Sequence, residues 1–445
     1  MFELIDTPSK ERFLRWKEKA TVWDFLHAIV LIFMGIYIFI NPFPHMTAVK
    51  GICFYLSALL VCALIIFKKM DFSFRSPLLA PFCLFTAWVL YGLFFAVDKE
   101  NSIHDFHAHL LRYIALYFIL INVFNSRKQF IALTRIIIAS STTYSILGIF
   151  YFYFILGNSW ATRFSYGASK GFLGYEVAGN SLCALVIFSI LLTLSLFRNA
   201  SFRQNVFLVF CLIPQIAFVF LVQSRGAYIA LFLSLIIMLW KNKKVLLLML
   251  IGLSVIVFAS PLKERLTIPP KGVLGDYRIK MMFTDLEIVK DYPVTGIGFG
   301  NETYGEKIAL GMYNDRVPQK YRQTKGFIAH APHNMLLNIL VRTGYLGLVF
   351  FVSIIFVFFW MCWQCARNRE DDFVRRWGLC ICSVFLSFLV IGMFEQMFHH
   401  FTEVVLYTIL AMGTIVWKLY SSMSGDTVPV IDKDSRITGI VGGNQ

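Results

Sequence analysis

Long apolar runs, separated by shorter polar or charged stretches, dominate this chain of 445 residues. Twelve of them approach the length of about 20 residues that a helix needs to cross a bilayer. Because backbone polar groups in lipid must be paired within their own segment, we predict that these runs are helices. The pattern therefore predicts an all-α polytopic membrane protein with about 12 transmembrane helices. The runs lie near 24–42, 47–67, 77–97, 106–125, 131–157, 176–197, 205–223, 226–241, 244–261, 334–362, 378–397 and 402–420.

One long polar segment divides these helices into two groups. It is far longer than the other predicted outer connections, which is typical of a functional loop with structure of its own. The final residues are polar and rich in Gly, Asp and Ser, so we expect a disordered tail. The predicted segments are a cytoplasmic N-terminal segment at 1–23, transmembrane helices 1–9 at 24–261, the large loop at 262–333, transmembrane helices 10–12 at 334–420 and a cytoplasmic tail at 421–445.

The large loop is predicted to contain short helices. Residues 284–290 have an amphipathic pattern and should form a helix that ends before Asp291-Tyr292-Pro293. Two further short pieces are expected around 301–313 and 318–329. Between them, Gly296-x-Gly298-x-Gly300 resembles a phosphate-binding loop only superficially, because the preceding strand and following acid of a dinucleotide site are missing. We interpret it as a backbone turn.

Composition changes how the charge of the chain is interpreted. Hydrophobic residues make up 58% of the sequence, charged residues only 15%, and the mean hydropathy is +0.68. If the N-terminus lies in the cytoplasm, 23 of the 41 Lys and Arg residues fall in cytoplasmic segments, and only six fall in outer connections other than the large loop. This bias predicts both termini in the cytoplasm and the large loop outside. The net charge of +15 then reflects topology rather than nucleic-acid binding.

The most informative stretch follows the large loop: His333-Asn334, nine residues, then Gly344-x-x-Gly347. On a straight helix the glycines fall within about 20° and 40° of His333, so one face would carry an imidazole above a bare groove. A neutral imidazole at the membrane boundary can accept a proton, which makes His333 a candidate general base. A capping or buried structural histidine is the alternative. His330 could share the task, but two histidines without a third ligand do not indicate a metal site.

Two arginines are candidates for binding an anion. Arg225 lies in Ser224-Arg225-Gly226, a turn between apolar helices at the predicted outer face. The glycine allows a ligand to approach closely, and a guanidinium suits the geometry of phosphate. A helix-end arginine that reaches toward water explains the pattern equally well. Arg278 opens the amphipathic part of the loop, where a solvated surface pair is the simpler interpretation of that residue alone.

A third polar group, Glu395-x-x-x-His399-His400, is expected at the outer end of the helix predicted over 378–397. Glu395 could orient a base. We favour a structural ion pair instead, with one of Arg112, Arg225 and Arg342. On a straight helix Arg342 falls about 180° from His333, so we do not place it in the same site.

These motifs together resemble the O-antigen ligase family. The family's histidine–glycine signature fits His333-Asn334 followed by Gly344-Tyr345-Leu346-Gly347, and its arginine turn fits Ser224-Arg225-Gly226. Its loop motif fits Tyr277-Arg278 followed by Asp291-x-Pro293-x-x-Gly296-x-Gly298. The topology also matches, so the resemblance extends from about 75 to 415. Members move oligosaccharides from undecaprenyl diphosphate to an acceptor, and lipopolysaccharide ligases, O-antigen polymerases and protein O-oligosaccharyltransferases share the motifs.

The resemblance implies an inverting, metal-independent glycosyltransferase of the GT-C type in the bacterial inner membrane, with a periplasmic active site. Its implied partners are an undecaprenyl-diphosphate-linked glycan donor, a lipid A-core acceptor and membrane lipids, without cofactor or nucleic acid. His333 would act as general base, and Arg225 and Arg278 would stabilise the diphosphate leaving group. The residues implied to bind substrate are Ser224, Gly226, His330, Asn334, Gly344 and Gly347.

Two alternatives stay open. An O-antigen or capsule polymerase, which uses a second lipid-linked glycan as acceptor, shares these motifs. A flippase or transporter of lipid-linked saccharide is less favoured, because such proteins carry ionisable groups or broken helices near mid-membrane and repeat symmetry. Here the informative polar residues gather at the predicted outer face.

Overall fold

Helices account for every regular element in the part of the chain that the computed structural model describes, which is residues 21–160, 162–164, 179–197, 201–240, 242–259, 277–323 and 331–422. Eight of these helical segments are long and apolar enough to cross a membrane. The prediction of an all-α polytopic membrane protein is confirmed. The eight are α2 (Val22–Ile40), α3 (Thr47–Ile66), the continuous series α5 (Lys99–Asp105), η2 (Phe106–Leu111) and α6 (Arg112–Val123), α7 (Arg127–Ile149) with η3 (Phe150–Ile155), α9 (Phe202–Leu221), α16 (Met335–Arg367), α17 (Asp372–Gly392) and α18 (His400–Ser421).

Four other apolar helices coincide with the remaining predicted runs. They are α4 (Leu79–Gly92) with η1 (Leu93–Phe95), α8 (Gly179–Phe197), α10 (Arg225–Leu239) and α11 (Lys243–Ala259). The total of twelve crossings and the GT-C type stay predictions. Several boundaries were predicted wrongly: the span predicted at 106–125 begins at Lys99, α17 begins at Asp372, and α16 continues to Arg367. The boundary that matters most is the end of α17 at Gly392, because residues 393–399 form a loop rather than the end of a helix. Most of the predicted N-terminal segment and the predicted tail lie outside the described residues.

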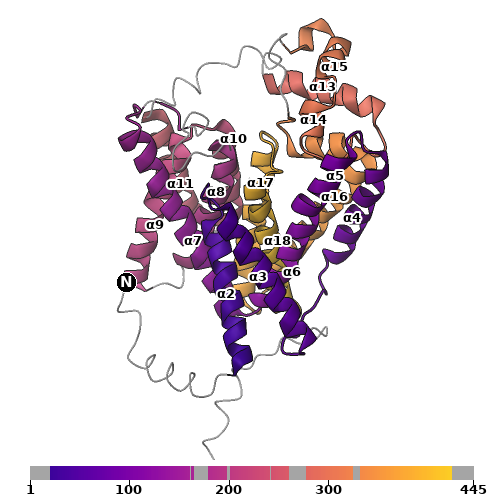
Figure 1. Ribbon diagram of the computed structural model, residues 1–445. Helices are drawn as coiled ribbons and strands as arrows, with labels where there is room; N and C mark the ends of the chain where they lie inside the picture. Colours follow the sequence, from indigo (N-terminus) through magenta and orange to yellow (C-terminus); the bar gives the residue numbers. More distant parts are fainter. Residues whose placement is uncertain are drawn as a thin grey trace, which may run out of the picture.

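The C-terminal helices α17 and α18 form the centre of the fold (Figure 1). Helix α17 packs against α8, α10, α16 and α18, while α18 also packs against α6. Small residues allow the close approach that helix association in lipid requires. A Cβ atom at Gly378 of α17 would lie 2.6 Å from the Cβ atom of Cys365, and one at Gly413 of α18 would lie 2.4 Å from the ring of Phe358.

The described part of the large loop, residues 277–323, is a small helical unit docked on one end of α16 (Figure 1). It contains α13 (Tyr277–Asp291), α14 (Thr303–Glu306), α15 (Leu310–Arg316) and the 3₁₀ turn η5 (Gln319–Tyr321). The prediction of short helices in this loop is therefore confirmed. The loop shares a separate apolar core with the first turns of α16, formed by Ile288, Val289, Ile297, Tyr304, Ile308, Leu310, Tyr313, Leu340 and Val341.

A kink at Gly344 shapes the contact between this loop and α16. Gly344 has φ 70° and ψ −174°, a conformation that interrupts the helix and that favours glycine. Backbone groups freed by the kink pair with the loop: Ile297 N–H donates to the carbonyl of Val341 (2.9 Å), and Tyr345 N–H donates to that of Pro293 (2.9 Å). The kink therefore fastens the loop to the helix that begins beside His333.

The bare groove predicted beside the two glycines is wrong. A Cβ atom at Gly344 would lie 1.9 Å from the carbonyl oxygen of Val294, so the loop backbone already fills that space. At Gly347 the Thr343 side chain occupies the corresponding position, 2.1 Å away. The prediction also assumed a straight helix. The kink at Gly344 interrupts the helical periodicity, so His333 and Gly347 do not share one helix face. These glycines permit close packing within the protein.

The Gly296-x-Gly298-x-Gly300 segment is a backbone turn, as predicted. Gly296 and Gly298 have φ 69° and 112°. A Cβ atom at Gly298 would lie 2.6 Å from the hydroxyl of Ser102, and one at Gly300 would lie 1.8 Å from the side-chain oxygen of Asn101. The glycines thus let the loop pass tightly over the start of α5.

Candidate functional site

His333 lies immediately before α16, at a well-defined helix start. Asn334 is the N-cap residue: its side chain accepts a hydrogen bond from the N–H of Leu337 (3.0 Å) and donates one to the carbonyl of Met393 (3.3 Å). This cap leaves His333 outside the helix, with 36% of its side chain exposed. The imidazole is therefore accessible to water and anchored beside the 393–399 loop.

Glu395 holds one ring nitrogen of His333. The Nδ1 atom of His333 lies 3.3 Å from Oε1 of Glu395, whose side chain is buried. A carboxylate can only accept a hydrogen bond, so Nδ1 donates and Nε2 keeps the lone pair that can accept a proton. A carboxylate that orients a histidine in this way is a recurring device for general-base catalysis.

The structure gives Glu395 a partner other than the arginines that the sequence favoured. The sequence suggests a structural ion pair with an arginine, whereas the structure places this carboxylate on His333. Of the arginines considered, Arg342 pairs with Asp105 and Arg112 lies over aromatic rings. The contact with His333 fits the expectation that Glu395 could orient a base, and the ion pair with Arg225 stays a prediction.

The Arg225 turn meets the same loop. Ser224 caps α10 by accepting a hydrogen bond from the N–H of Ala227 (3.3 Å), and the exposed Arg225 is the first residue of that helix. A Cβ atom at Gly226 would lie 2.9 Å from the ring of Phe394, so the glycine allows α10 to pack directly on the neighbour of Glu395. Residues 393–399 thus join the Arg225 turn to His333.

Helix α13 contributes Arg278 and, unexpectedly, Asp285. The two residues are seven apart and therefore lie on one face of the helix; Arg278 is exposed and Asp285 is 1% exposed. Oδ1 of Asp285 accepts a hydrogen bond from the hydroxyl of Tyr304 (2.5 Å), while its buried Oδ2 has no partner among the described residues. Burial raises the pKa of Asp285 to about 7, against the opposing effects of Tyr304 and the nearby His333.

Asp285 therefore belongs to the surroundings of His333, although nothing in its sequence context distinguished it from other polar residues on α13. The structure brings together His333, Glu395, Asp285 and the start of α10, with Arg278 on the same face of α13 as Asp285. His330, which the sequence suggested as a second histidine, lies outside the described residues.

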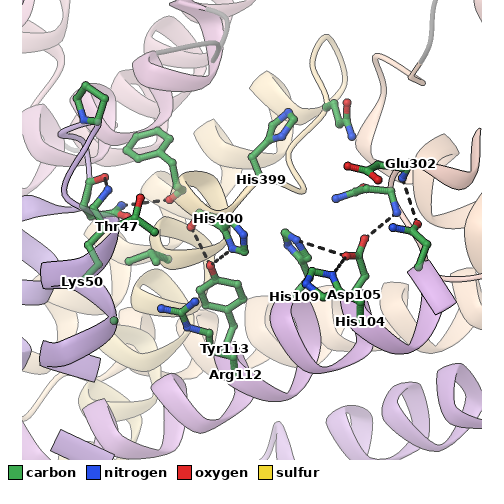
Figure 2. Close-up of a pocket in the computed structure, with 18 of the residues that line it drawn as sticks. Thr47, Lys50, His104, Asp105, His109, Arg112, Tyr113, Glu302, His399 and His400 are labelled. Atoms are coloured by element: carbon green, nitrogen blue, oxygen red, sulfur yellow. Dashed lines mark hydrogen bonds and ion pairs between the residues drawn. The ribbon is translucent and has the colours of Figure 1, made fainter. Parts of the chain in front are cut away.

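A second polar group lines a cavity of about 1320 Å³ on the side of the protein that carries the large loop. Helices α2 and α3, the α5–α6 series, the start of α18 and residues 301–302 of the loop form its walls (Figure 2). Gln396 and His399 of the 393–399 loop also line it. The same loop therefore separates this cavity from His333. Burial lowers the pKa of His399, Glu395 opposes this shift, and the nearby His109 and His333 add to it.

Three residues near the cavity could supply metal ligands by proximity. Ligand atoms of His109, His400 and Glu403 lie within 4.8 Å of one another. However, the rings of His109 and His400 stack with centroids 4.2 Å apart and planes at 16°. A metal ion must lie in the plane of each imidazole that binds it, which two stacked rings do not allow. Nδ1 of His109 instead lies 2.6 Å from Oε2 of Glu403, so a hydrogen-bonded pair describes this group better than a metal centre.

Arg342 ties the cavity wall to the large loop. This buried guanidinium lies 3.9 Å from Asp105 of α5 and donates a hydrogen bond to the side-chain oxygen of Asn301 (3.0 Å). Asn301 in turn donates from its backbone N–H to Asp105 (2.7 Å). These contacts fix the loop against α5, although Nε and one terminal nitrogen of Arg342 have no hydrogen-bond partner among the described residues.

The sequence singled out His399, His400 and Arg112 but did not predict that they line a shared cavity, although a signal exists for such a site. Lys50, His109, Arg112 and Glu403 all interrupt or border predicted apolar runs. Ionisable residues inside membrane-spanning segments are expensive and usually face a cavity or a partner, so each is by default a candidate functional residue.

Residues 206–352 match the family model described as O-antigen ligase, which covers about a third of the chain. The matched segment contains the Arg225 turn, helix α13 with Arg278, and the kinked start of α16 with His333. No curated protein matches the chain. The match confirms the resemblance to the O-antigen ligase family, and it supports a glycosyltransferase activity of the O-antigen ligase or polymerase type.

Proposed function

We propose that this protein, through its O-antigen ligase segment, is an inverting, metal-independent glycosyltransferase that moves an O-antigen from undecaprenyl diphosphate to lipid A-core. The reaction would take place at the periplasmic face of the bacterial inner membrane, with both termini in the cytoplasm. One observation carries the proposal: His333 is accessible, is held through Nδ1 by the buried Glu395, and lies beside the loop that also receives the Arg225 turn.

In this mechanism Nε2 of His333 accepts the proton of the acceptor hydroxyl while the hydroxyl oxygen attacks the anomeric carbon of the donor sugar. The bond between that carbon and the diphosphate oxygen breaks, and undecaprenyl diphosphate leaves with the electron pair. Attack opposite the leaving group inverts the anomeric centre. Glu395 stabilises the positive charge that forms on the imidazole, and a positioned base of this kind contributes about 10²–10⁴-fold to the rate.

The leaving group requires positive charge, because its negative charge grows as the bond breaks. Arg225 and Arg278 are the proposed sources, acting as fixed cations in place of a divalent metal. Ser224 and Gly226 would shape the turn that presents Arg225, and Asn334 would fix the start of α16. Gly344, Gly347 and His330 complete the proposed substrate-binding residues, the two glycines through the packing of the large loop rather than through an open groove.

The decisive experiment uses purified protein in lipid nanodiscs with labelled lipid-linked donor and lipid A-core. His333→Ala should abolish transfer, while labelled donor stays unconsumed. His107→Ala is the matched control, since His107 is an exposed histidine that bonds only within its own helix among the described residues. Transfer at the wild-type rate by the His333 variant would remove this residue from catalysis and refute the proposed mechanism.

The same assay separates the ligase from the polymerase, which the family match also accommodates. Transfer that requires lipid A-core supports the ligase. Growth of the glycan on a second lipid-linked molecule, without lipid A-core, would identify a polymerase. Movement of intact donor across the membrane, unaffected by Arg225 or His333 substitution, would instead support a flippase.

A further inference from the structure

The cavity beside the 393–399 loop has walls of opposite charge. Lys50 and Arg112 line one side, and Asp105 and Glu302 line the other (Figure 2); Glu100 also lines the cavity. Aromatic side chains complete the surface near the cations. A ligand that fits both walls needs an anionic group at one end and hydroxyl groups, which can donate to carboxylates, at the other.

Arg112 is the strongest single indication of a ligand. Its guanidinium carbon lies 5.1, 5.6 and 5.9 Å from the ring centroids of Phe54, Tyr55 and Tyr113. The guanidinium has a hydrogen-bonding neighbour in the hydroxyl of Tyr37, but its buried Nε has no hydrogen-bond partner among the described residues. The nearby buried carboxylates Asp105 and Glu403 pair elsewhere, with His109 and Arg342. A guanidinium held within a membrane-spanning helix and lining a cavity is costly unless something neutralises it.

Lys50 places a second cation beside the first. Its ammonium is fixed at the end of α2, where it donates hydrogen bonds to the carbonyls of Asn41 (2.9 Å) and Phe43 (2.8 Å). Lys50 and Arg112 lie close enough to repel one another. An anion bound between them would remove this repulsion and would receive the planar donor fork that guanidinium offers to phosphate or carboxylate.

We propose that this cavity binds the acceptor, and that Arg112 and Lys50 hold an anionic substituent of the acceptor glycan, such as a sugar phosphate. This inference rests on the proposed function. The carboxylates of the acidic wall repel the anionic substituent and accept hydrogen bonds from sugar hydroxyls. The glycan is therefore oriented with its anionic end at Arg112 and Lys50. The diphosphate of the donor is assigned to Arg225 and Arg278, which do not line this cavity.

That loop connects the proposed acceptor site to the reacting centre. His399 and Gln396 face the cavity, and Glu395 contacts His333. An acceptor anchored at Arg112 would therefore reach His333 by passing over the loop that both sites share. The arrangement separates the two negatively charged substrates and lets only a hydroxyl approach the imidazole.

The test compares lipid A-core with the same acceptor after phosphatase treatment, in binding and in transfer. Without donor, wild-type protein in nanodiscs should bind the phosphorylated acceptor about 10–100-fold more tightly than the treated one, as expected for charge-assisted hydrogen bonds. Arg112→Gln should abolish this difference, and Arg112→Lys should retain part of it. In transfer, Arg112→Gln should raise KM for the phosphorylated acceptor and leave KM for the donor unchanged.

The controls keep each failure distinguishable. Lys99→Gln removes an exposed cation at the start of α5 that does not line the cavity, and should bind both acceptors as wild type does. Lys50→Gln offers a second variant if Arg112→Gln does not fold. His333→Ala should lose transfer yet keep phosphate-dependent binding, so binding is measurable even if the proposed chemistry is wrong. Equal affinity of wild-type protein for both acceptors, or an Arg112 effect confined to the donor, would overturn the assignment.

Discussion

Replacement of Asp285 by asparagine tests whether a protonated carboxyl is built into the surroundings of His333. Asparagine keeps the shape of the side chain and an oxygen that can accept the hydrogen bond from Tyr304, but it cannot ionise. Burial raises the pKa of Asp285 from 3.8 to about 7 in the folded protein. The variant therefore removes one titration and changes little else.

The sign of the effect follows from proton binding. Between pH 4 and pH 7 the folded state holds a proton on Asp285 that the unfolded state has released, so wild-type stability falls as pH rises through this range. The change in the pKa of Asp285, at about 1.4 kcal/mol per pKa unit, lowers the free energy of unfolding by an amount on the order of 4 kcal/mol. This loss is complete above about pH 7. Asp285→Asn should match the wild type near pH 4 and exceed its stability progressively toward pH 8.

The assay is thermal unfolding in one detergent, followed by intrinsic fluorescence from pH 4.5 to pH 8. Asp291→Asn is the control: hydrogen bonds from Arg316 and Tyr313 lower the pKa of Asp291, so the stability difference between this variant and wild type should stay constant from pH 4.5 to pH 8. Its ionised form is stabilising, and the stability that it contributes is lost only as pH falls below the usual range for a carboxyl. Parallel pH profiles for wild type and Asp285→Asn would refute the reasoning, since Asp285 would then titrate alike in both states.

Three other predictions test the residues around His333. Glu395→Gln should lower kcat about 10–100-fold with little change in donor KM, because a neutral amide stabilises the imidazolium less well; an unchanged kcat would exclude an orienting role. Gly344→Ala should lower Tm, because φ is 70° at this residue and the new Cβ atom would meet the carbonyl of Val294. Gly252→Ala is the control and should leave Tm unchanged, since open space surrounds Gly252. Equal Tm values for the two variants would contradict the kink. Asn334→Ala should lower the free energy of unfolding by about 0.5–2 kcal/mol, and Asn334→Ser should lower it much less, because serine can also cap a helix. Equal losses in unfolding measurements would argue against a capping role.

Much of this fold could be predicted because its determinants are local. Apolar runs identified the helices, and the long polar segment identified the loop with its short helices. The boundary of α17 failed for a local reason as well: residues 393–399 are apolar enough to continue a helix, and only their contacts with His333, Asn334 and α10 show that they form a loop.

The site was predictable only in part. The resemblance to family motifs indicated His333, Arg225 and Arg278 as candidates, because such motifs are a property of short segments. The partners of these residues were not predictable. Glu395 lies 62 residues from His333 along the chain, and His109 lies 294 residues from Glu403. Such pairs form when helices distant in sequence pack together, and hydrophobic patterning does not specify which helices these are.

The sequence by itself determined the class of the protein, the position of its large loop and the histidine and arginines that suggest transferase chemistry. Only the tertiary structure decided that a buried carboxylate holds His333, that the glycines pack against the loop instead of opening a groove, and that a charged cavity adjoins the site. The physical reason is that secondary structure in lipid follows from local hydrophobicity and internal backbone pairing, whereas a site depends on side chains that only the packing of separate helices brings within hydrogen-bond distance.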